Sequence, residues 1–211
     1  MPAEQKRARA ALLRERTGEA AHLLVIGLGN PGDEYEGTRH NLGADVVNLL
    51  ASRHNAPLRR GKERALVAEA RIDGKLMALA FPQTFVNLSG ESAARLVRRY
   101  GVEGDMSRVV VVHDELDLPP GRVKIKEGGG TAGHNGLESI RAHLHSGAFI
   151  RVRVGIGKPP GRQQGADYVL KPIRKAEQVE FDVAVVEAAE AVELIFTEGV
   201  AAAMNQVNTG T

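Results

Sequence analysis

Residues 22–32 read HLLVIGLGNPG. The first half of this stretch is a short apolar run typical of a buried strand, and the glycines and proline at 29–32 end that strand. Beyond this turn, residues 42–53 carry apolar side chains at helical spacing. A buried strand that leads through a turn into an amphipathic helix favours an α/β arrangement.

The same alternation continues along the chain. Residues 65–72 and 75–81 flank Asp73-Gly74, a strong short signal for a β-hairpin. Further strand patterns occupy 108–112, 122–126 and 150–156, and helical patterns occupy 89–100, 135–145 and 175–196. We therefore predict an α/β fold: one three-layer domain at 22–208, with a mixed, mostly parallel central sheet flanked by helices. Residues 1–21 form an N-terminal extension that we expect to be poorly ordered.

The composition restricts the chemistry and the compartment. The 211 residues include no cysteine, which excludes disulfides, thiolate metal sites and a cysteine nucleophile. No apolar run approaches the roughly 20 residues of a membrane span. The charged residues spread through 1–21 are also unlike a secretory signal. We therefore expect a cytoplasmic protein without membrane contact, in which histidines and carboxylates carry the polar chemistry.

The net charge is only +2, but the charges are unevenly distributed. Residues 177–198 are strongly acidic, whereas 122–166 are basic and contain only Glu127 and Glu138 as carboxylates. The basic residues of that segment are Arg122, Lys124, Lys126, Arg141, Arg151, Arg153, Lys158 and Arg162. A basic middle beside an acidic tail indicates a polyanionic partner on one face.

Two of the predicted strands concentrate this basic charge. Alternation places Lys124 and Lys126 on one side of their strand, and Arg151 and Arg153 on one side of theirs. Such pairs suit contacts with phosphate groups, whose attraction is long-ranged and sensitive to salt.

The glycines at 27, 29 and 32 also match the GxGxxG pattern of dinucleotide-binding proteins. That fingerprint needs a helix N-terminus whose N–H groups face pyrophosphate. Here Pro31 lacks an N–H group, carboxylates follow at 33, 34 and 36, and no acidic residue stands about 20 positions further on to bind ribose. A nucleotide-dependent oxidoreductase is therefore disfavoured. The turn is better explained as one that displays Asn30, Tyr35 and His40 beyond a strand end.

A second strand end supplies a carboxylate. The apolar run 109–112 leads directly into His113 and Asp114. A carboxylate there can accept a hydrogen bond from an imidazole, fix its tautomer and leave the other nitrogen free to take a proton from water. The residue types therefore suggest that His40 pairs with Asp114. Two alternatives stay open: His113 is the functional histidine, or His113, Asp114 and His134 bind a metal, although the usual ligand spacings are missing.

Two further segments hold polar residues beside predicted helices. Residues 126–136 form a glycine-rich loop that can approach a phosphate closely, but the loop lacks the lysine and hydroxyl residue of an NTPase. Asn135 is either a helix cap, because it and Glu138 have the spacing of a capping box, or a substrate contact. Asn87 is either a cap, which we favour, or an oxyanion donor, and Phe85 is either core or a base-stacking platform.

Four long segments resemble bacterial peptidyl-tRNA hydrolases. They are LVIGLGNPGDEYEGTRHNLG at 24–43, FPQTFVNLSG at 81–90, VVHDELDLPPGRVKIKEGGGTAGHNGLESI at 111–140 and RVRVGIGKP at 151–159. They occur in the order of the family and reach from about residue 22 to the last predicted helix. The resemblance implies a monomeric enzyme of translation and ribosome rescue that cuts the ester between a peptide and tRNA. It implies no cofactor, no metal and no obligate protein partner.

The resemblance also implies roles for individual residues. His40 would be the general base that activates water, and Asp114 would hold it in its basic form. Asn30 would sense the blocked amino group, so that free aminoacyl-tRNA is spared. Asn87 and Asn135 would hold the peptidyl-adenosine end and polarise the ester, Tyr35 and Phe85 would line the site, and Lys124, Lys126 and Arg153 would bind phosphate.

Two positions depart from the family pattern. The family usually has methionine before Asn87 and lysine before Pro82, where this chain has Val86 and Phe81. Valine keeps an apolar wall but is shorter and stiffer than methionine, so we expect a slightly reshaped pocket with retained activity. One alternative function remains, an RNA-binding relative of the same fold that has lost catalysis, and the retained polar residues argue against it.

Overall fold

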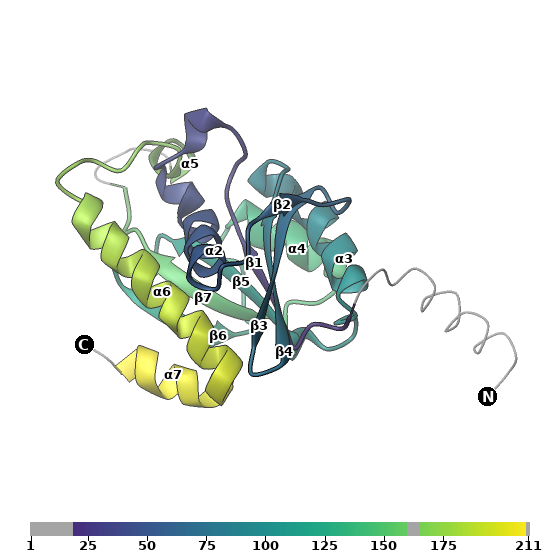
Figure 1. The fold of residues 1–211 in the computed structure, drawn as a ribbon. Helices are drawn as coiled ribbons and strands as arrows, with labels where there is room; N and C mark the ends of the chain where they lie inside the picture. The colour runs from purple at the N-terminus through teal and green to yellow at the C-terminus, as the bar shows by residue number, and fades with distance from the viewer. Residues whose placement is uncertain (1–18, 160–164, 210–211) are drawn as a thin grey trace, which may run out of the picture.

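The computed structural model describes residues 19–159 and 165–209 (Figure 1). Their strands form one sheet in the order β2-β3-β4-β1-β5-β7-β6. The central strands β4, β1, β5 and β7 run parallel, whereas the outer strands β2, β3 and β6 pair antiparallel with their neighbours. The strands are β1 (Leu23–Gly27), β2 (Arg59–Arg60), β3 (Ala65–Ile72), β4 (Lys75–Pro82), β5 (Val109–Glu115), β6 (Val123–Glu127) and β7 (Ile150–Gly155). The predicted mixed, mostly parallel sheet is confirmed.

Helices on both faces of the sheet complete the three predicted layers (Figure 1). One face carries α2 (Leu42–Arg53), α6 (Gln178–Glu198) and α7 (Val200–Thr209), and the other carries α3 (Ser89–Arg99) and α4 (Asn135–Leu144). Each face has its own apolar core, and alternate residues of β1 enter alternate cores: Leu23 and Val25 one, Leu24 and Ile26 the other. Burial on both faces explains the uninterrupted apolar run of this strand.

Two glycines let β1 and α2 touch. A Cβ atom on Gly27 would lie 2.1 Å from the carbonyl oxygen of Gly43, and one on Gly43 would lie 2.3 Å from that of Val112. Only glycine therefore allows α2 to begin directly against the ends of β1 and β5. The turn that precedes α2 is thereby fixed at the carboxyl ends of the parallel strands, where α/β proteins bind ligands.

Several boundaries differ from the predicted ones. β5 continues to Glu115, so that His113 and Asp114 are strand residues. The last predicted helix begins at Gln178 and ends before Gly199, whose φ of 88° separates it from α7. The strand β2 and the helix α5 (Gly165–Val169) are too short to produce a periodic pattern, which is why the sequence did not reveal them.

Residues 1–18 of the predicted extension, and Arg162 of the basic segment, lie outside the described residues. Ala21 is completely buried, and its N–H donates to the carbonyl of Tyr100 at 2.9 Å. Within 19–159 and 165–209, no helix is both long and apolar enough to cross a membrane.

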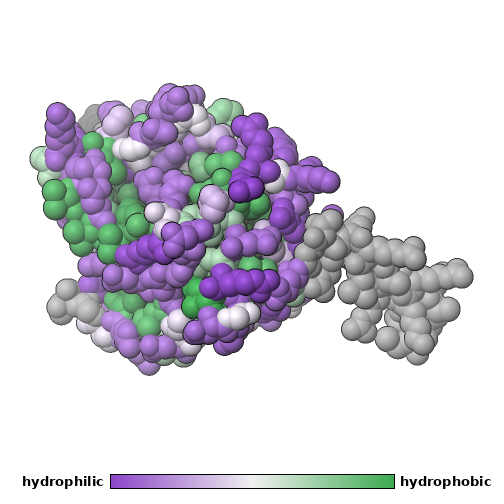
Figure 2. Space-filling view, viewed as in Figure 1, coloured by the Kyte–Doolittle hydropathy of each residue, from purple (hydrophilic) through white to green (hydrophobic). Residues whose placement is uncertain are grey.

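The acidic segment and the two lysines of β6 face opposite sides of the sheet. The acidic segment forms α6, whose solvent side exposes Glu180, Asp182, Glu187 and Glu190. Figure 2 shows this side as largely hydrophilic, with apolar side chains over α6, where Val179 and Val183 are exposed. In β6, Val123 and Ile125 face the α6 core, so Lys124 and Lys126 point to the other face of the sheet. A polyanion can therefore approach one face without meeting the acidic helix.

Candidate active site

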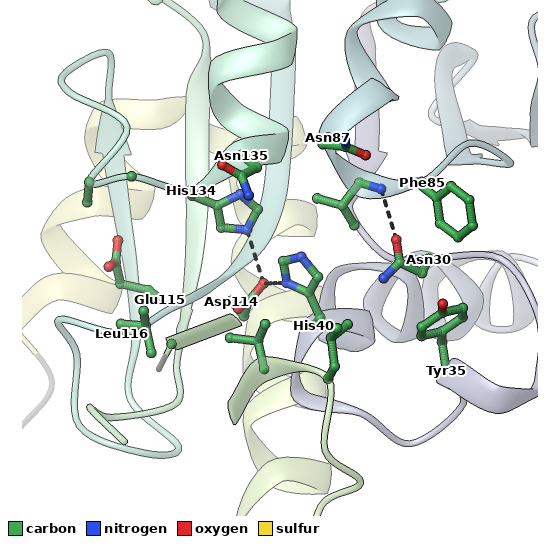
Figure 3. Close-up of a pocket in the computed structure, with 16 residues that line it drawn as sticks. Asn30, Tyr35, His40, Phe85, Asn87, Asp114, Glu115, Leu116, His134 and Asn135 are labelled. Carbon is green, nitrogen blue, oxygen red and sulfur yellow. Dashed lines mark hydrogen bonds and ion pairs between the residues drawn. The ribbon is translucent and has the colours of Figure 1, made fainter. Parts of the chain in front are cut away.

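A cavity of about 460 Å³ opens at the carboxyl ends of β1, β4 and β5 (Figure 3). The residues that the sequence analysis placed around the ester all line it: Asn30, Tyr35, His40, Phe85, Asn87, Asp114 and Asn135. The GxGxxG-like turn leads only into the three-residue η1 (Asp33–Tyr35) with two carboxylates, so it offers no helix N-terminus to a pyrophosphate.

His40 and Asp114 are in direct contact. His40 Nδ1 lies 2.8 Å from Asp114 Oδ1, and the two side chains are 14% and 2% exposed. Burial alone would lower the pKa of His40, but the charge and the hydrogen bond of Asp114 outweigh it and raise this pKa above the ordinary 6.5. Burial also opposes ionisation of Asp114, but the two imidazoles that face it hold its pKa well below the usual range. Nδ1 of His40 therefore donates, and Nε2 keeps its electron pair toward the cavity (Figure 3).

The turn that carries His40 is tied to its neighbours by the two residues beside it. The Asn41 side chain accepts the N–H of Asn30 at 2.9 Å and donates to the carbonyl of the same residue at 3.0 Å. Arg39 is buried and pairs with Glu177 at 2.9 Å. These contacts join the turn to the loop after β1 on one side and to the start of α6 on the other, so the imidazole projects from a fixed backbone.

Asn30 presents a donor to the cavity. Its Oδ1 accepts the N–H of the buried Val86 at 2.9 Å, which turns the amide nitrogen toward the cavity (Figure 3). An amide N–H can donate a hydrogen bond to the carbonyl oxygen of a peptide. It cannot accept one from an ammonium group, which is itself a donor. Val86 holds Asn30 through its backbone, a contact that does not depend on the departure from methionine at this position.

The segment between β4 and α3 corrects the expected role of Asn87 and decides between the two alternatives for Phe85. Asn87 does not cap α3: the N-cap is Leu88, without a side-chain hydrogen bond, and the exposed Asn87 lines the cavity. Phe85 is not core, because it is 55% exposed and its ring meets that of Tyr35 edge-on, with centroids 6.3 Å apart. The two rings form an exposed aromatic wall that suits the stacking of a base.

The glycine-rich loop decides between the two alternatives for Asn135. The N-cap of α4 is His134, whose Nδ1 accepts the N–H groups of Gly136 at 3.1 Å and Leu137 at 3.4 Å. Asn135 is the first helical residue and is free to line the cavity. Glu138 accepts the hydroxyl of Thr131 instead of completing a capping box. His134 also reaches Asp114, with Nε2 3.1 Å from Oδ1. Its place just before a predicted helix was the available signal, although histidine is not among the preferred caps.

His113 is turned away from the cavity. It is buried, its Nδ1 donates to the carbonyl of Asp114 at 2.7 Å, and burial lowers its pKa to about 3. Both alternatives that used His113, as the base or as a metal ligand, are therefore wrong. Among the described residues, the group of three potential ligands whose atoms all lie within 4.8 Å of one another is His40, Asp114 and His134, without His113.

The basic residues of β6 and β7 have unequal surroundings. Arg151 is buried and donates to the carbonyls of Gly129 and Gly130, so it fixes the glycine-rich loop and does not pair with Arg153 as a surface contact. Arg153 forms an ion pair with Glu115 at 3.0 Å. Lys124, which pairs with Arg153 in the register, and the exposed Lys126 lie outside the cavity walls, on the face of the sheet opposite α6.

Comparison with known proteins gives one consistent result. A sequence model of the family described as Peptidyl-tRNA hydrolase matches residues 24–211. The peptidyl-tRNA hydrolase of Nocardia farcinica is 50% identical over 186 residues, which are 88% of this chain and 95% of the relative. That of Cutibacterium acnes is 45% identical over 197 residues, 88% of this chain and 98% of the relative. The crystal structure of the enzyme from Acinetobacter baumannii superposes with a TM-score of 0.83 at 36% identity, covering 92% of this chain and 97% of that one.

Proposed function

This chain belongs to the peptidyl-tRNA hydrolase family and hydrolyses the ester that joins a peptide to tRNA, and we propose that His40 activates the attacking water. The observation that carries the proposal is the 2.8 Å contact between His40 Nδ1 and Asp114 Oδ1, which leaves Nε2 facing the cavity. An RNA-binding relative without catalysis would not need this buried pair, so the pair favours the hydrolase over that alternative.

The reaction begins when water in the cavity gives a proton to His40 Nε2 and its oxygen adds to the ester carbonyl carbon. The carbonyl oxygen becomes an anion, to which the amides of Asn87 and Asn135 donate from the cavity wall. The bond to the ribose oxygen then breaks, and that oxygen takes the proton from His40. The products are a tRNA with a free ribose hydroxyl and a peptide carboxylic acid, which releases its remaining proton to solvent and becomes a carboxylate. General-base help contributes about 10²–10⁴ in rate, and one oxyanion donor about 10²–10³.

Substrate selection follows from the groups around the ester. Asn30 donates to the first peptide carbonyl of a blocked aminoacyl group, an acceptor that free aminoacyl-tRNA lacks. Tyr35 and Phe85 stack against the terminal base, and Lys124, Lys126 and Arg153 bind phosphates of the tRNA. By the resemblance to the family, we also propose that the enzyme is a monomer without an obligate protein partner or cofactor. The substrate arises in translation, so the enzyme acts in the cytoplasm, and ribosome rescue is its cellular role.

The acid limb of the pH profile should report on His40. A base must be unprotonated, so kcat/KM should fall as the pH decreases through the pKa of His40, which Asp114 raises above 6.5. Initial rates on N-acetylaminoacyl-tRNA across the acid to neutral range should therefore give a midpoint above 6.5. A midpoint below that value, or a profile without an acid limb, would refute the raised pKa.

Replacing Lys124 or Lys126 with alanine should weaken tRNA binding and leave the chemical step intact. Each lost phosphate contact lowers the slope of log K against log salt by about 0.7–0.9. Equilibrium binding of tRNA at several salt concentrations measures this slope, and single-turnover hydrolysis at saturating enzyme measures the chemical step.

Lys75→Ala, in the hairpin at the opposite end of β4, is the matched control. Loss of single-turnover rate with an unchanged salt slope would contradict the phosphate role. The lysines are preferred to Arg153, whose loss would leave the buried Glu115 without its partner.

A further inference from the structure

Asp114 is held by a second imidazole besides that of His40. Its Oδ1 accepts from His40 Nδ1 at 2.8 Å and lies 3.1 Å from His134 Nε2. We propose that His134 is a positioning residue: as a neutral ring with its hydrogen on Nε2, it pins the Asp114 carboxylate in the orientation that aligns His40. The inference rests on the proposed function, because it assigns His134 to the base of that reaction.

The helix α4 fixes the tautomer of His134. A backbone N–H can only donate, and Nδ1 receives two of them, from Gly136 and Leu137, at the helix N-terminus. Nδ1 therefore carries no hydrogen, and the single ring hydrogen of a neutral imidazole is on Nε2. That nitrogen is the one that points at Asp114 (Figure 3). The hydrogen bonds that cap α4 therefore keep the ring hydrogen of His134 on Nε2, where it donates to Asp114.

The same bonds make His134 a poor metal ligand, although His40, Asp114 and His134 offer three ligand atoms within 4.8 Å of one another. A metal bound through Nε2 would require the hydrogen to move to Nδ1. There it would point at two backbone N–H groups that have no other helical acceptor. The three side chains are therefore better explained as a chain of hydrogen bonds in which two histidines donate to one carboxylate oxygen.

The surroundings of His134 are rigid enough for this role. Its side chain is 10% exposed, and the ring of the buried His113 packs edge-on against it with centroids 5.0 Å apart. The helix α4 is locked against α3 at Gly90, whose N–H donates to Ser139 Oγ at 3.0 Å and where a Cβ would lie 2.2 Å from the Ser139 carbonyl oxygen. Because α4 is held in place, Nε2–H of His134 cannot move with the Asp114 carboxylate if that side chain rotates. A rotation would break this hydrogen bond, so the bond opposes the rotation.

Two variants separate the donor role of His134 from its capping role. In His134→Asn the amide oxygen takes the place of Nδ1 and can cap α4, since Asn is a preferred N-cap, but no donor reaches Asp114. In His134→Gln the amide nitrogen takes the place of Nε2 and can donate to Asp114, but the cap is lost. We expect His134→Asn to lose about 10–100-fold in kcat, by analogy with the loss seen when the partner that orients a metal-bound histidine is removed, with little change in KM. His134→Gln should retain most of the wild-type kcat despite a lower melting temperature.

The result that would overturn the inference is an equal loss in both variants, or a wild-type kcat in His134→Asn. A second measurement does not depend on the variants folding. The ¹⁵N spectrum of wild-type protein labelled at histidine should show His134 in the Nε2–H form at neutral pH, and an Nδ1–H or doubly protonated ring would overturn the proposal. Hydrolysis by the wild type, and its loss in His40→Ala, test the proposed function separately, so the two failures are distinguishable.

Discussion

Replacing His40 with alanine should lower kcat by about 10²–10⁴-fold while the affinity for tRNA stays nearly the same. Among the described residues, His40 is the only histidine with a free ring nitrogen at the cavity, because Nε2 of His134 donates to Asp114 and His113 does not line the cavity. Glu115 also lines the cavity, but its carboxylate is paired with Arg153. The lysines that are proposed to bind phosphate lie outside the cavity walls. Single-turnover hydrolysis of N-acetylaminoacyl-tRNA and equilibrium binding of the same tRNA measure the two quantities.

The matched control for this substitution is His143→Ala. His143 is exposed near the C-terminal end of α4. Within the described part of the chain, its ring forms one hydrogen bond, to the carbonyl of Ser139 in the same helix. The control should keep both the wild-type rate and the wild-type affinity. If tRNA affinity fell in His40→Ala as far as kcat did, the imidazole would be a binding group and its role as the base would be contradicted.

Replacing Asp114 with asparagine should lower kcat by about 10²–10³-fold and move the acid limb of the pH profile to lower pH. Where an asparagine turns its amide N–H toward the catalytic imidazole, the wrong tautomer costs about 10⁴ in rate. Here Nε2–H of His134 can only donate, so it favours the asparagine oxygen, and not the amide nitrogen, at the position of Asp114 Oδ1. His40 therefore keeps its tautomer, and only the negative charge beside it is lost. That charge raises the pKa of His40 against the effect of burial, so its removal lowers the pKa.

The profile of kcat/KM against pH for Asp114→Asn and wild type checks this prediction. The double variant with His40→Ala is the control, because residues that act as one unit lose activity non-additively. It should be no slower than His40→Ala alone. An unshifted acid limb in Asp114→Asn, or additive losses in the double variant, would show that Asp114 does not act through His40.

Much of the fold could be predicted because its signals are local. The apolar run of β1, the Asp73-Gly74 hairpin and the alternation in β6 and β7 each depend on residues that are neighbours in the sequence. The pairing of His40 with Asp114 could be suggested from residue type and position, because His40 lies beyond the end of β1, Asp114 lies at the end of β5, and these parallel strands end at one edge of the sheet.

The surroundings of the site residues could not be predicted in the same way, because they depend on how loops pack against the sheet and helices. No pattern among neighbouring residues indicates that packing. Alternation places Arg151 beside Arg153, but the glycine-rich loop returns over Arg151 and buries it. Asn135 has the spacing of a cap, yet the loop enters α4 one residue earlier, and His134 supplies the acceptor. The sequence grouped His134 with Asp114 only as possible metal ligands. Its role as a hydrogen-bond donor could not be predicted, because the tautomer of a histidine ring follows from the contacts of both nitrogens.

The role of His40 as the base can be measured by the release of N-acetylated amino acid from N-acetylaminoacyl-tRNA in the presence of a chelator, with wild type and His40→Ala compared at saturating enzyme. We expect rapid, chelator-resistant release by the wild type and its loss in the variant, although both bind the tRNA equally. Failure of the wild type to release the amino acid despite binding, or undiminished release by His40→Ala, would contradict hydrolysis by a water that His40 activates.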